Sequence, residues 1–381
     1  MSKSFIVQSV LLPMLVSSTA AVGADVPGRW LHSLCKPLSI TKYGPFVVLE
    51  NGHLMTVDRN VLAASADDGK TWTQVGPTIQ SGIRMGGGGH PGQFMRTAHG
   101  TIVIVYLDMD AYKFSWDNNK GAPKPDCKLE LWCIRSTDGG KTWIDRQRLL
   151  GGYNADFMGF IQTRKGTLVV TVEHLAPDLR RWVSCSFVSA DEGKTWKQGN
   201  LIDLGGHGHH DGAVEPMVAE LSDGRLLMLL RTNLDRFWQA WSTDGGRYWR
   251  TLKPSEIDAS SSPGWLLRLR SGRLALVWNR LTPEGKSSYP RASHPGPASE
   301  FPASWHREEL SLVFSSDDGA TWTKPVVIAR QPGGKLCYPY MLERRPGELW
   351  ITTHGQAGKG GKTVPPLAIG LMEKDFVAKG Q

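Results

Sequence analysis

The chain has 381 residues, including 43 glycines and 15 tryptophans, and its net charge is +8. This is longer than a typical domain, but all-β folds often form one unit of this size. The lysines and arginines are scattered rather than clustered, and no nucleic-acid-binding motif is present, so we expect no nucleic-acid partner. The positive charge of the protein favours an acidic carbohydrate as its partner.

The first residues, 1–24, have the pattern of a secretory signal peptide. Lys3 precedes an apolar core, Val10–Val16, and small residues follow at Val22-Gly23-Ala24, where cleavage is expected. The core is too short to span a bilayer and no other segment approaches the needed length, so we expect no stable membrane insertion. We therefore expect a secreted or periplasmic protein in which residues 25–381 form one domain.

Two repeats then run along the chain. Six pairs of short apolar runs flank a glycine turn, at Asn51-Gly52, His99-Gly100, Lys165-Gly166, Asp223-Gly224, Ser271-Gly272 and Pro346-Gly347. The first five hairpins are each followed by an S-x-D-x-G-x-x-W box, at Ser65–Trp72, Ser136–Trp143, Ser189–Trp196, Ser242–Trp249 and Ser315–Trp322. In such a turn the Asp side chain accepts hydrogen bonds from turn amides, and the Trp packs across the strand pair. The boxes are therefore predicted to be structural.

Six units with this content predict an all-β protein, a six-bladed β-propeller with five Asp-box turns. The sixth unit lacks a box, and Leu367–Met372 offers it one further strand. We expect residues near Trp30–Leu34 to supply the missing outer strand and close the ring.

Three insertions interrupt the repeats and are expected to wall a cleft. They are Asp108–Lys128, Thr282–Arg307 and Gly355–Pro366. Their aromatic residues either stack on a sugar or pack within their own loops; these are Tyr112, Phe114, Trp116, Tyr289, Phe301 and Trp305.

The residues just before each hairpin should converge on the central axis, because the innermost strand of each blade begins there. They are Lys42, Tyr43, His90, Asn154, Asp156, His207, His209, His210, Asp211, Ser260–Ser262, Cys337 and Tyr338. So many polar and titratable groups predict a binding site, although polar residues and water also fill propeller channels that have no activity. Lys42, His90, His210 and Asp211 are our candidates for substrate binding.

The His207–Asp211 segment allows three interpretations: metal binding, hydrogen bonding or acid/base chemistry on a sugar, and a structural role. Adjacent His209 and His210 point in opposite directions in an extended chain, so at most two of the three histidines face one side. We assign no metal ion and no cofactor to this protein, and we expect Asp211 to be the member of the segment at the cleft.

The hairpin around Asp223-Gly224 should place Glu215 beside Arg231, although the two residues are sixteen positions apart. A carboxylate and a guanidinium at one strand end look like one wall of an active site.

The boxes, the six-bladed plan and the HDGAVEPMVAELSDGRLLMLLRT block resemble the sialidase (neuraminidase) superfamily, and more closely the exported bacterial sialidase-like BNR-repeat proteins. The resemblance covers essentially the whole chain after residue 24. It implies that Tyr338 is the nucleophile, Glu215 activates it, and Asp58 is the acid/base. It also implies that Arg231 and Arg307 are the second and third of the three arginines that hold the substrate carboxylate.

The first arginine of that family is absent, since its Arg-Ile-Pro turn aligns with Tyr43-Gly44-Pro45 and leaves Lys42 as the nearby cation. Lysine is a point charge, whereas arginine holds a carboxylate with two parallel donors. Without this arginine, the resemblance does not extend to N-acetylneuraminic acid itself as the substrate. It still implies that the substrate is a glycan.

The resemblance therefore implies a sialidase-like exo-glycoside hydrolase that acts on terminal acidic sugars by a retaining mechanism. Two guanidiniums that meet in one cleft repel each other unless an anion binds there, which also indicates an anionic glycan. The alternatives are a hydrolase or lyase for another sugar that uses the His/Asp residues, and a glycan-binding propeller without catalysis.

The chain has five cysteines, so at least one is unpaired and they do not form a complete disulfide framework. Whether Cys127 and Cys133 form a single disulfide bond is left open by the sequence.

Overall fold

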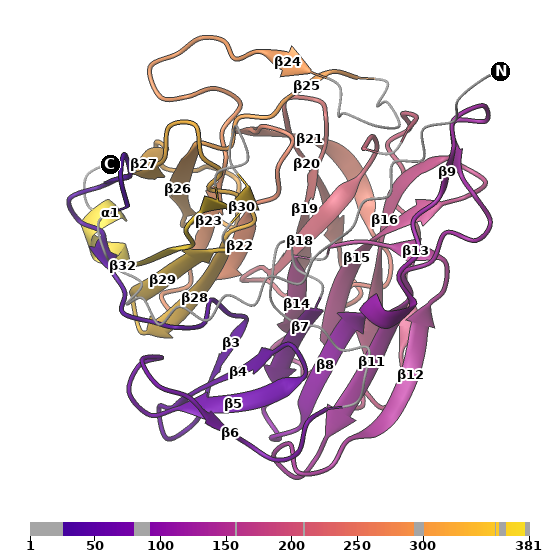
Figure 1. The fold of residues 1–381 in the computed structure, drawn as a ribbon, viewed down its shortest axis with the longest axis vertical. Coiled ribbons are helices and arrows are strands. Elements are labelled where there is room, and N and C mark those ends of the chain that lie inside the picture. Colours follow the sequence, from indigo (N-terminus) through magenta and orange to yellow (C-terminus); the bar gives the residue numbers. More distant parts are fainter. Residues whose placement is uncertain are drawn as a thin grey trace, which may run out of the picture.

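The structure is a computed structural model that describes residues 26–79, 92–156, 158–208, 210–292, 301–354, 356–357 and 363–377. Six antiparallel sheets follow one another in chain order around a central axis (Figure 1). The predicted six-bladed β-propeller is confirmed. The predicted signal sequence, residues 1–24, lies outside the described residues.

The first three blades are built from neighbouring strands of the chain. The first contains β3 (Phe46–Val48), β4 (Leu54–Asp58), β5 (Val61–Ser65) and β6 (Thr73–Gln74). The second contains β7 (Gly92–Arg96), β8 (Ile102–Leu107), β11 (Leu131–Ser136) and β12 (Ile144–Leu150). The third contains β14 (Gly159–Gln162), β15 (Leu168–Ala176), β16 (Arg181–Ser189) and β17 (Lys197–Gln198), with β13 (Tyr153–Asn154) also paired to β15.

The other three blades complete the ring. The fourth contains β18 (Val214–Glu220), β19 (Leu226–Arg231), β20 (Arg236–Ser242) and β21 (Arg250–Asp258). The fifth contains β22 (Trp265–Arg268), β23 (Leu274–Trp278), β26 (Glu309–Ser315), β27 (Val326–Arg330) and β1 (Trp30–Leu31). The sixth contains β28 (Tyr340–Arg345), β29 (Glu348–Thr353), β32 (Leu367–Met372) and β2 (Lys36–Pro37).

Short elements lie outside the blades. They are a 3₁₀ turn (Met109–Ala111), the two-residue pairs β9 (Trp116–Asp117) with β10 (Ala122–Pro123), β24 (Arg291–Ala292) with β25 (Ala303–Ser304) and β30 (Gln356–Ala357) with β31 (Thr363–Val364), and the helix α1 (Glu373–Val377). Within the part of the chain that the structure describes, no helix has the length and apolar character needed to cross a bilayer.

The ring is closed by the N-terminal segment, but not by the residues that we expected. Trp30–Leu31 pairs with β27 and extends the fifth blade, and Lys36–Pro37 pairs with β32 as the outer strand of the sixth. The expectation for Trp30–Leu34 is therefore wrong in position. The segment reaches two exposed strand edges in turn, and each edge offers backbone groups that need partners.

The predicted hairpins are all present, and their glycines explain why the turns occur where they do. Gly52 has φ +80° and Gly224 has φ +87°, values that side-chain-bearing residues rarely adopt. The second strand of each hairpin lies in the middle of its sheet and between two other blades. Strands β8, β19 and β23 are accordingly buried at every residue, which is why they appear in the sequence as continuous apolar runs.

The boxes form the predicted turns, and each box aspartate accepts a hydrogen bond from its box serine. In the fourth box Asp244 also accepts from the amide of Tyr248 at 3.0 Å. The Trp249 Nε1–H group donates to the Gly246 carbonyl at 3.0 Å and to Ser186 Oγ of the third blade at 2.8 Å. The box tryptophan therefore fastens its own turn to the preceding blade.

The five cysteines are buried free thiols, so the bridge left open between Cys127 and Cys133 does not form. Cys133 lies on β11 in the core between the second and third blades. The interior is held together by packing rather than by covalent cross-links.

The box tryptophans should carry a large share of the stability. Trp249→Ala removes a side chain that is 4% exposed together with two hydrogen bonds, and should lower the free energy of unfolding by about 3–5 kcal/mol. The neighbouring Tyr248 is 47% exposed, so Tyr248→Ala should change it by about 0.5 kcal/mol or less. Urea titrations followed by circular dichroism compare the two variants, and equal midpoints would contradict the assigned role of the box.

Candidate active site

A pocket of about 210 Å³ opens where the strands of several blades end near the axis. It is lined by Tyr153, Ala155, Asp156, Glu173, Trp182, His210, Val214, Glu215, Arg231, Trp305, Arg307 and Tyr338. Four of the residues to which the resemblance assigned a role are in this set, and they come from the fourth to the sixth blade: Glu215, Arg231, Arg307 and Tyr338.

The backbone of β18 is bulged at Glu215. The pairing of β18 with β19 shifts between Val214 and Met217, Pro216 has no N–H, and Glu215 has φ +45°. A side-chain-bearing residue with positive φ is strained, and such strain persists where the surroundings hold it in place. Here the Glu215 amide donates to Glu173 Oε2 of the preceding blade at 2.7 Å.

Arg231 ends β19 beside Glu215, as the hairpin predicted. Its Nη1 lies 2.7 Å from Glu215 Oε2, and both side chains are 4% exposed. Nε and Nη2 donate to Ser261 Oγ at 3.2 and 3.1 Å. Burial lowers the pKa of Arg231, but the charge of Glu215, its hydrogen bond with Arg231 and the nearby Tyr338 together raise the pKa above its ordinary value. All three guanidinium nitrogens are thus engaged within the protein.

Tyr338 stands immediately before the last blade and also has positive φ, +53°. Its hydroxyl donates to Glu215 Oε1 at 2.7 Å, which is the direct contact that the roles implied by the resemblance require. Burial and then the negative charge of Glu215 raise the pKa of Tyr338 well above its ordinary value, although Arg231 and Arg307 oppose them. The phenol therefore keeps its proton while the site is at rest.

Arg307 and Trp305 form the opposite wall. Arg307 Nη2 donates to the Ser261 carbonyl at 2.8 Å, and Nη1 contacts Cys337 Sγ at 3.7 Å. The Trp305 ring lies 5.1 Å from the Arg307 guanidinium carbon and 5.6 Å from that of Arg231. Both distances fall in the range of a cation–π contact.

The charges of the pocket correct one premise of the sequence analysis. Asp156, Glu173 and Glu215 line it together with Arg231 and Arg307. Glu215 and Asp156 therefore provide carboxylates from the protein itself, and the repulsion between the guanidiniums alone does not require an anionic ligand. The sequence analysis placed Asp156 at the axis, but it did not consider Asp156 as a counter-charge to the arginines.

Asp58 and Lys42 lie apart from this pocket. Lys42 Nζ is 2.5 Å from Asp58 Oδ2, and neither residue is among those that line the pocket. Asp58 is the last residue of β4, and only Arg59 and Asn60 separate β4 from β5. A loop this short leaves the carboxylate paired with its neighbour, and the assignment of Asp58 as acid/base is without support in the geometry.

The His/Asp segment contributes one residue. His210 lines the pocket and lies edge-on to Trp305, with 6.2 Å between ring centroids. Asp211 is buried outside the lining, where its Oδ1 accepts from the Gly212 amide at 2.9 Å, so our expectation that Asp211 faces the cleft is wrong. His90 and His209 lie outside the described residues, and among those described no three His, Cys, Asp or Glu side chains could hold a metal ion.

Glu173 is the site residue that the sequence reasoning missed. It lies in LVVTVEHLA, the nine-residue strand β15, and is 5% exposed. The sequence contains a signal for Glu173, namely an acidic residue within an otherwise apolar strand. A charged group buried in this way needs a partner or has a function.

The aromatic residues of the insertions have different roles. Trp305 faces the pocket, whereas Phe114 and Trp116 stack on each other, and Phe114 packs against Tyr153 at 5.3 Å between ring centroids. For these two residues the loop-packing alternative describes the structure. Tyr289 packs on His306 at 5.1 Å.

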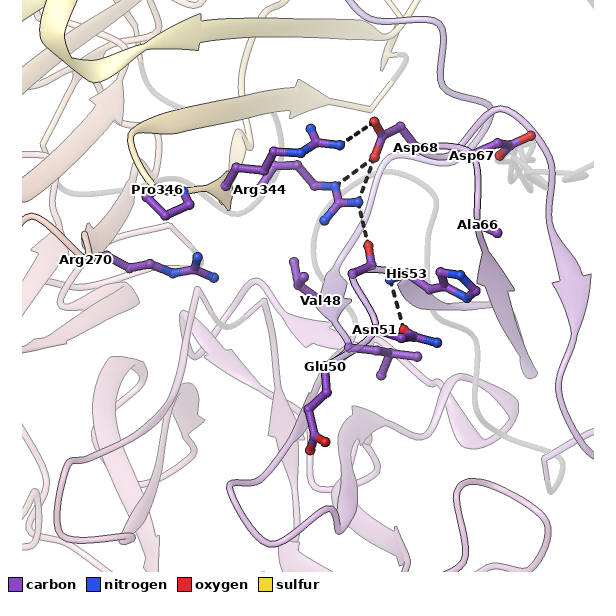
Figure 2. A pocket seen from close by; sticks show the side chains of 13 residues that line it. Val48, Glu50, Asn51, His53, Ala66, Asp67, Asp68, Arg270, Arg344 and Pro346 are labelled. Carbon is purple, nitrogen blue, oxygen red and sulfur yellow. Dashed lines mark hydrogen bonds and ion pairs between the residues drawn. The ribbon is translucent and has the colours of Figure 1, made fainter.

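A second cavity, of about 750 Å³, lies at the other ends of the strands, among the hairpin turns and the first box (Figure 2). Its Arg344 donates to Asp68 Oδ1 at 2.7 Å and to the Gly52 carbonyl at 2.6 Å, and Arg345 pairs with Asp68 Oδ2 at 2.7 Å. Both arginines thus hold the first box against the sixth blade. This cavity lacks the combination of nucleophile and carboxylate that marks the axial pocket.

Comparison with known proteins agrees with this fold. Residues 89–351 match the model of the BNR repeat-like domain. A sialidase of Micromonospora viridifaciens is 26% identical over 287 residues, which are 71% of this chain and 41% of that protein. The chain thus spans less than half the length of this relative.

Solved structures share the fold at low identity. A Dyadobacter fermentans protein of unknown function superposes with a TM-score of 0.57 at 18% identity, over 91% of this chain and 100% of that one. The NanB sialidase of Streptococcus pneumoniae, in its K499G form, gives 0.56 at 13% identity, over 87% and 68% of the two chains. An α-L-arabinanase of Penicillium chrysogenum gives 0.53 at 13% identity, over 87% and 92%.

The fold and the family match together define a sialidase-like β-propeller with BNR repeats. The chain belongs to the BNR repeat-like family.

The buried Arg231–Glu215 pair should matter more for stability than ion pairs at the surface. Arg231→Met removes the cation that lies 2.7 Å from the buried Glu215 carboxylate, and should lower the free energy of unfolding by about 3–5 kcal/mol. Arg164→Met breaks an exposed pair with Glu220 and should cost about 1 kcal/mol or less. Urea denaturation of both variants measures the difference, and equal costs would contradict an unrelieved buried charge.

Proposed function

We propose that this protein is a retaining exo-glycoside hydrolase of the sialidase type, with Tyr338 as nucleophile and Glu215 as the base that activates it. The observation that carries this proposal is the Tyr338 hydroxyl, which donates to Glu215 Oε1 at 2.7 Å while Arg231 holds the other carboxylate oxygen at 2.7 Å. A tyrosine nucleophile with this kind of partner is the known exception to the two-carboxylate pattern of glycosidases.

The proposed chemistry follows from the charges. Tyr338 is a poor nucleophile while protonated, and Glu215 accepts its proton as the oxygen attacks the anomeric carbon. The ion pair with Arg231 fixes the orientation of Glu215 and balances its charge before the proton arrives. The product of this step is a glycosyl-tyrosine, which water then hydrolyses with net retention of configuration.

The first candidate substrate is a terminal sugar with an acidic substituent. Arg307 Nε is buried and has no hydrogen-bond partner among the described residues, so it offers a donor to a carboxylate or sulfate. Arg231 is less suited to this role because Glu215 and Ser261 already engage its guanidinium. With Lys42 outside the pocket, the acidic group would be held by fewer cations than in a three-arginine site.

A neutral sugar is the second candidate, and the charge balance of the pocket favours it. The carboxyl groups of Glu215 and Asp156 already line the pocket together with the two guanidiniums, and the Trp305 ring lies over both guanidiniums. An aromatic ring at this place offers an apolar face to a sugar ring instead of a further positive charge.

We further propose that the protein acts on glycans outside the cytoplasm, because residues 1–24 have the pattern of a secretory signal.

Removal of the nucleophile is the direct test of the reaction. Against a panel of aryl glycosides that includes sialosides, Tyr338→Phe should lower kcat/KM by about 10³-fold or more, as expected when a nucleophile is lost. Tyr340→Phe is the matched control, since the Tyr340 hydroxyl bonds only to the backbone of Phe46 and lies outside the pocket. If the wild-type protein cleaves no glycoside, or Tyr338→Phe retains full activity, the proposed mechanism is wrong.

The two candidate substrates are separated by Arg307→Met. An arginine–carboxylate contact is worth about 2–5 kcal/mol, so kcat/KM for an acidic aryl glycoside should fall by about thirtyfold or more. For the matched uncharged glycoside it should change less than about threefold, since that contact does not exist. The neutral sugar would be favoured if the wild type prefers the uncharged glycoside and Arg307→Met lowers kcat/KM equally on the acidic and the uncharged glycoside.

A further inference from the structure

We propose that Glu173 is the catalytic proton donor of this pocket, which protonates the glycosidic oxygen as Tyr338 attacks the sugar. This proposal rests on the glycosidase reaction proposed above and assigns a residue to a step that the Tyr338–Glu215 pair leaves open. Glycoside cleavage releases a poor leaving group unless an acid protonates it.

The position of Glu173 suits this role. It comes from β15 of the third blade, whereas Glu215 and Tyr338 come from the fourth and sixth, and all three line the same pocket. The three residues thus surround one small space from different directions. A sugar bound there would have the nucleophile and the proton donor on separate blades.

The two carboxyl oxygens of Glu173 have different environments. Oε2 accepts the Glu215 amide hydrogen at 2.7 Å, which is a contact for the carbonyl-like oxygen of a protonated acid. Oε1 has no hydrogen-bond partner among the residues that the structure describes, and Glu173 is part of the pocket lining. A proton on Oε1 is therefore available to a ligand.

The surroundings also keep this carboxyl group neutral. Burial raises the pKa of Glu173, and the negative charges of Glu215 and Asp156 raise it further; the charge of Arg231 and the hydrogen bond from the Glu215 amide lower it, but the pKa stays well above its ordinary value. Tyr153 also faces Glu173 and carries no positive charge. Two carboxyl groups side by side, one ion-paired and one protonated, are the arrangement in which one serves as base and the other as acid.

The site needs such a donor. Asp58, to which the resemblance assigned this task, is paired with Lys42 outside the lining. His210 and Asp156 also line the pocket, but neither combines deep burial with an oxygen that is open to the cavity as Glu173 does.

The proposed steps balance. In the first, the Tyr338 oxygen bonds to the anomeric carbon, its proton passes to Glu215, the glycosidic C–O bond breaks, and Glu173 Oε1–H protonates the departing alcohol. In the second, water attacks the anomeric carbon and gives one proton to Glu173. The Tyr338–carbon bond breaks, and Glu215 returns its proton to the phenolate. Both carboxyl groups then have their starting protonation.

The test compares two leaving groups in the Glu173→Gln variant. Gln keeps an oxygen that accepts the Glu215 amide hydrogen, but it has no acidic proton. On the 4-methoxyphenyl glycoside of the sugar that the wild type cleaves, kcat/KM should fall by about 10²-fold or more, the usual contribution of a general acid. On the 2,4-dinitrophenyl glycoside, whose leaving group needs no proton, it should fall by less than about tenfold.

Two further measurements separate an acid from a positioning residue. The wild-type kcat/KM should decline as the pH rises through the raised pKa of Glu173, because the carboxyl group carries its proton only below that pKa, and Glu173→Gln should lack this decline. Azide, which needs no general base, should accelerate the variant and yield a glycosyl azide. A residue that only positions Glu215 would leave the pH profile and the azide response unchanged.

Glu343→Gln is the matched control. Glu343 is also buried and accepts a backbone amide hydrogen from the neighbouring blade at 2.7 Å, that of Arg270, but it lies far from the axial pocket, among the hairpin turns. Its kcat/KM should equal that of the wild type on both glycosides. If Glu173→Gln lowers kcat/KM equally on both glycosides, or on neither, Glu173 is not the proton donor. The Tyr338→Phe variant tests the nucleophile independently of this outcome.

Discussion

The chemistry of this protein depends on how one carboxylate, that of Glu215, is shared. One oxygen is paired with Arg231 at 2.7 Å and the other accepts the Tyr338 hydroxyl at 2.7 Å. The backbone amide of the same residue is held by Glu173. A buried carboxylate is costly unless it is paired, and here its partners are also the groups that the proposed glycosidase reaction uses.

The arrangement separates the residues that stabilise the propeller from those at the site. Box turns and hairpin glycines lie at one end of the strands, where Arg344 and Arg345 hold the first box (Figure 2). Strained residues at the other end, Glu215 and Tyr338, converge on the axis. The strained backbone at the site is held by contacts between blades, such as the hydrogen bond from the Glu215 amide to Glu173, while the box turns connect the blades at the other end.

The charge of the pocket shows why the substrate class depends on the carboxyl groups as much as on the arginines. Two guanidiniums by themselves indicate an acidic ligand, and the relatives named sialidase agree with that reading. The carboxylates of Glu215 and Asp156 reduce this requirement, since they are counter-charges that the protein itself supplies. The same fold also occurs in an arabinanase, so the fold alone leaves the sugar open.

The sequence by itself determined the propeller, the number of blades and the pairing of Glu215 with Arg231. Each of these follows from local patterns, namely a glycine turn between two apolar runs, a box motif, and the register of a single hairpin. Tyr338 and Arg307 match family motifs, so their place in the pocket could also be predicted from the sequence. Only the tertiary structure decided that Asp58 pairs with Lys42, that Asp211 turns away, that Lys36–Pro37 closes the ring and that Glu173 joins the site. These outcomes depend on distances between blades and on the desolvation and charge of groups brought together at the axis, which no local pattern in the chain contains.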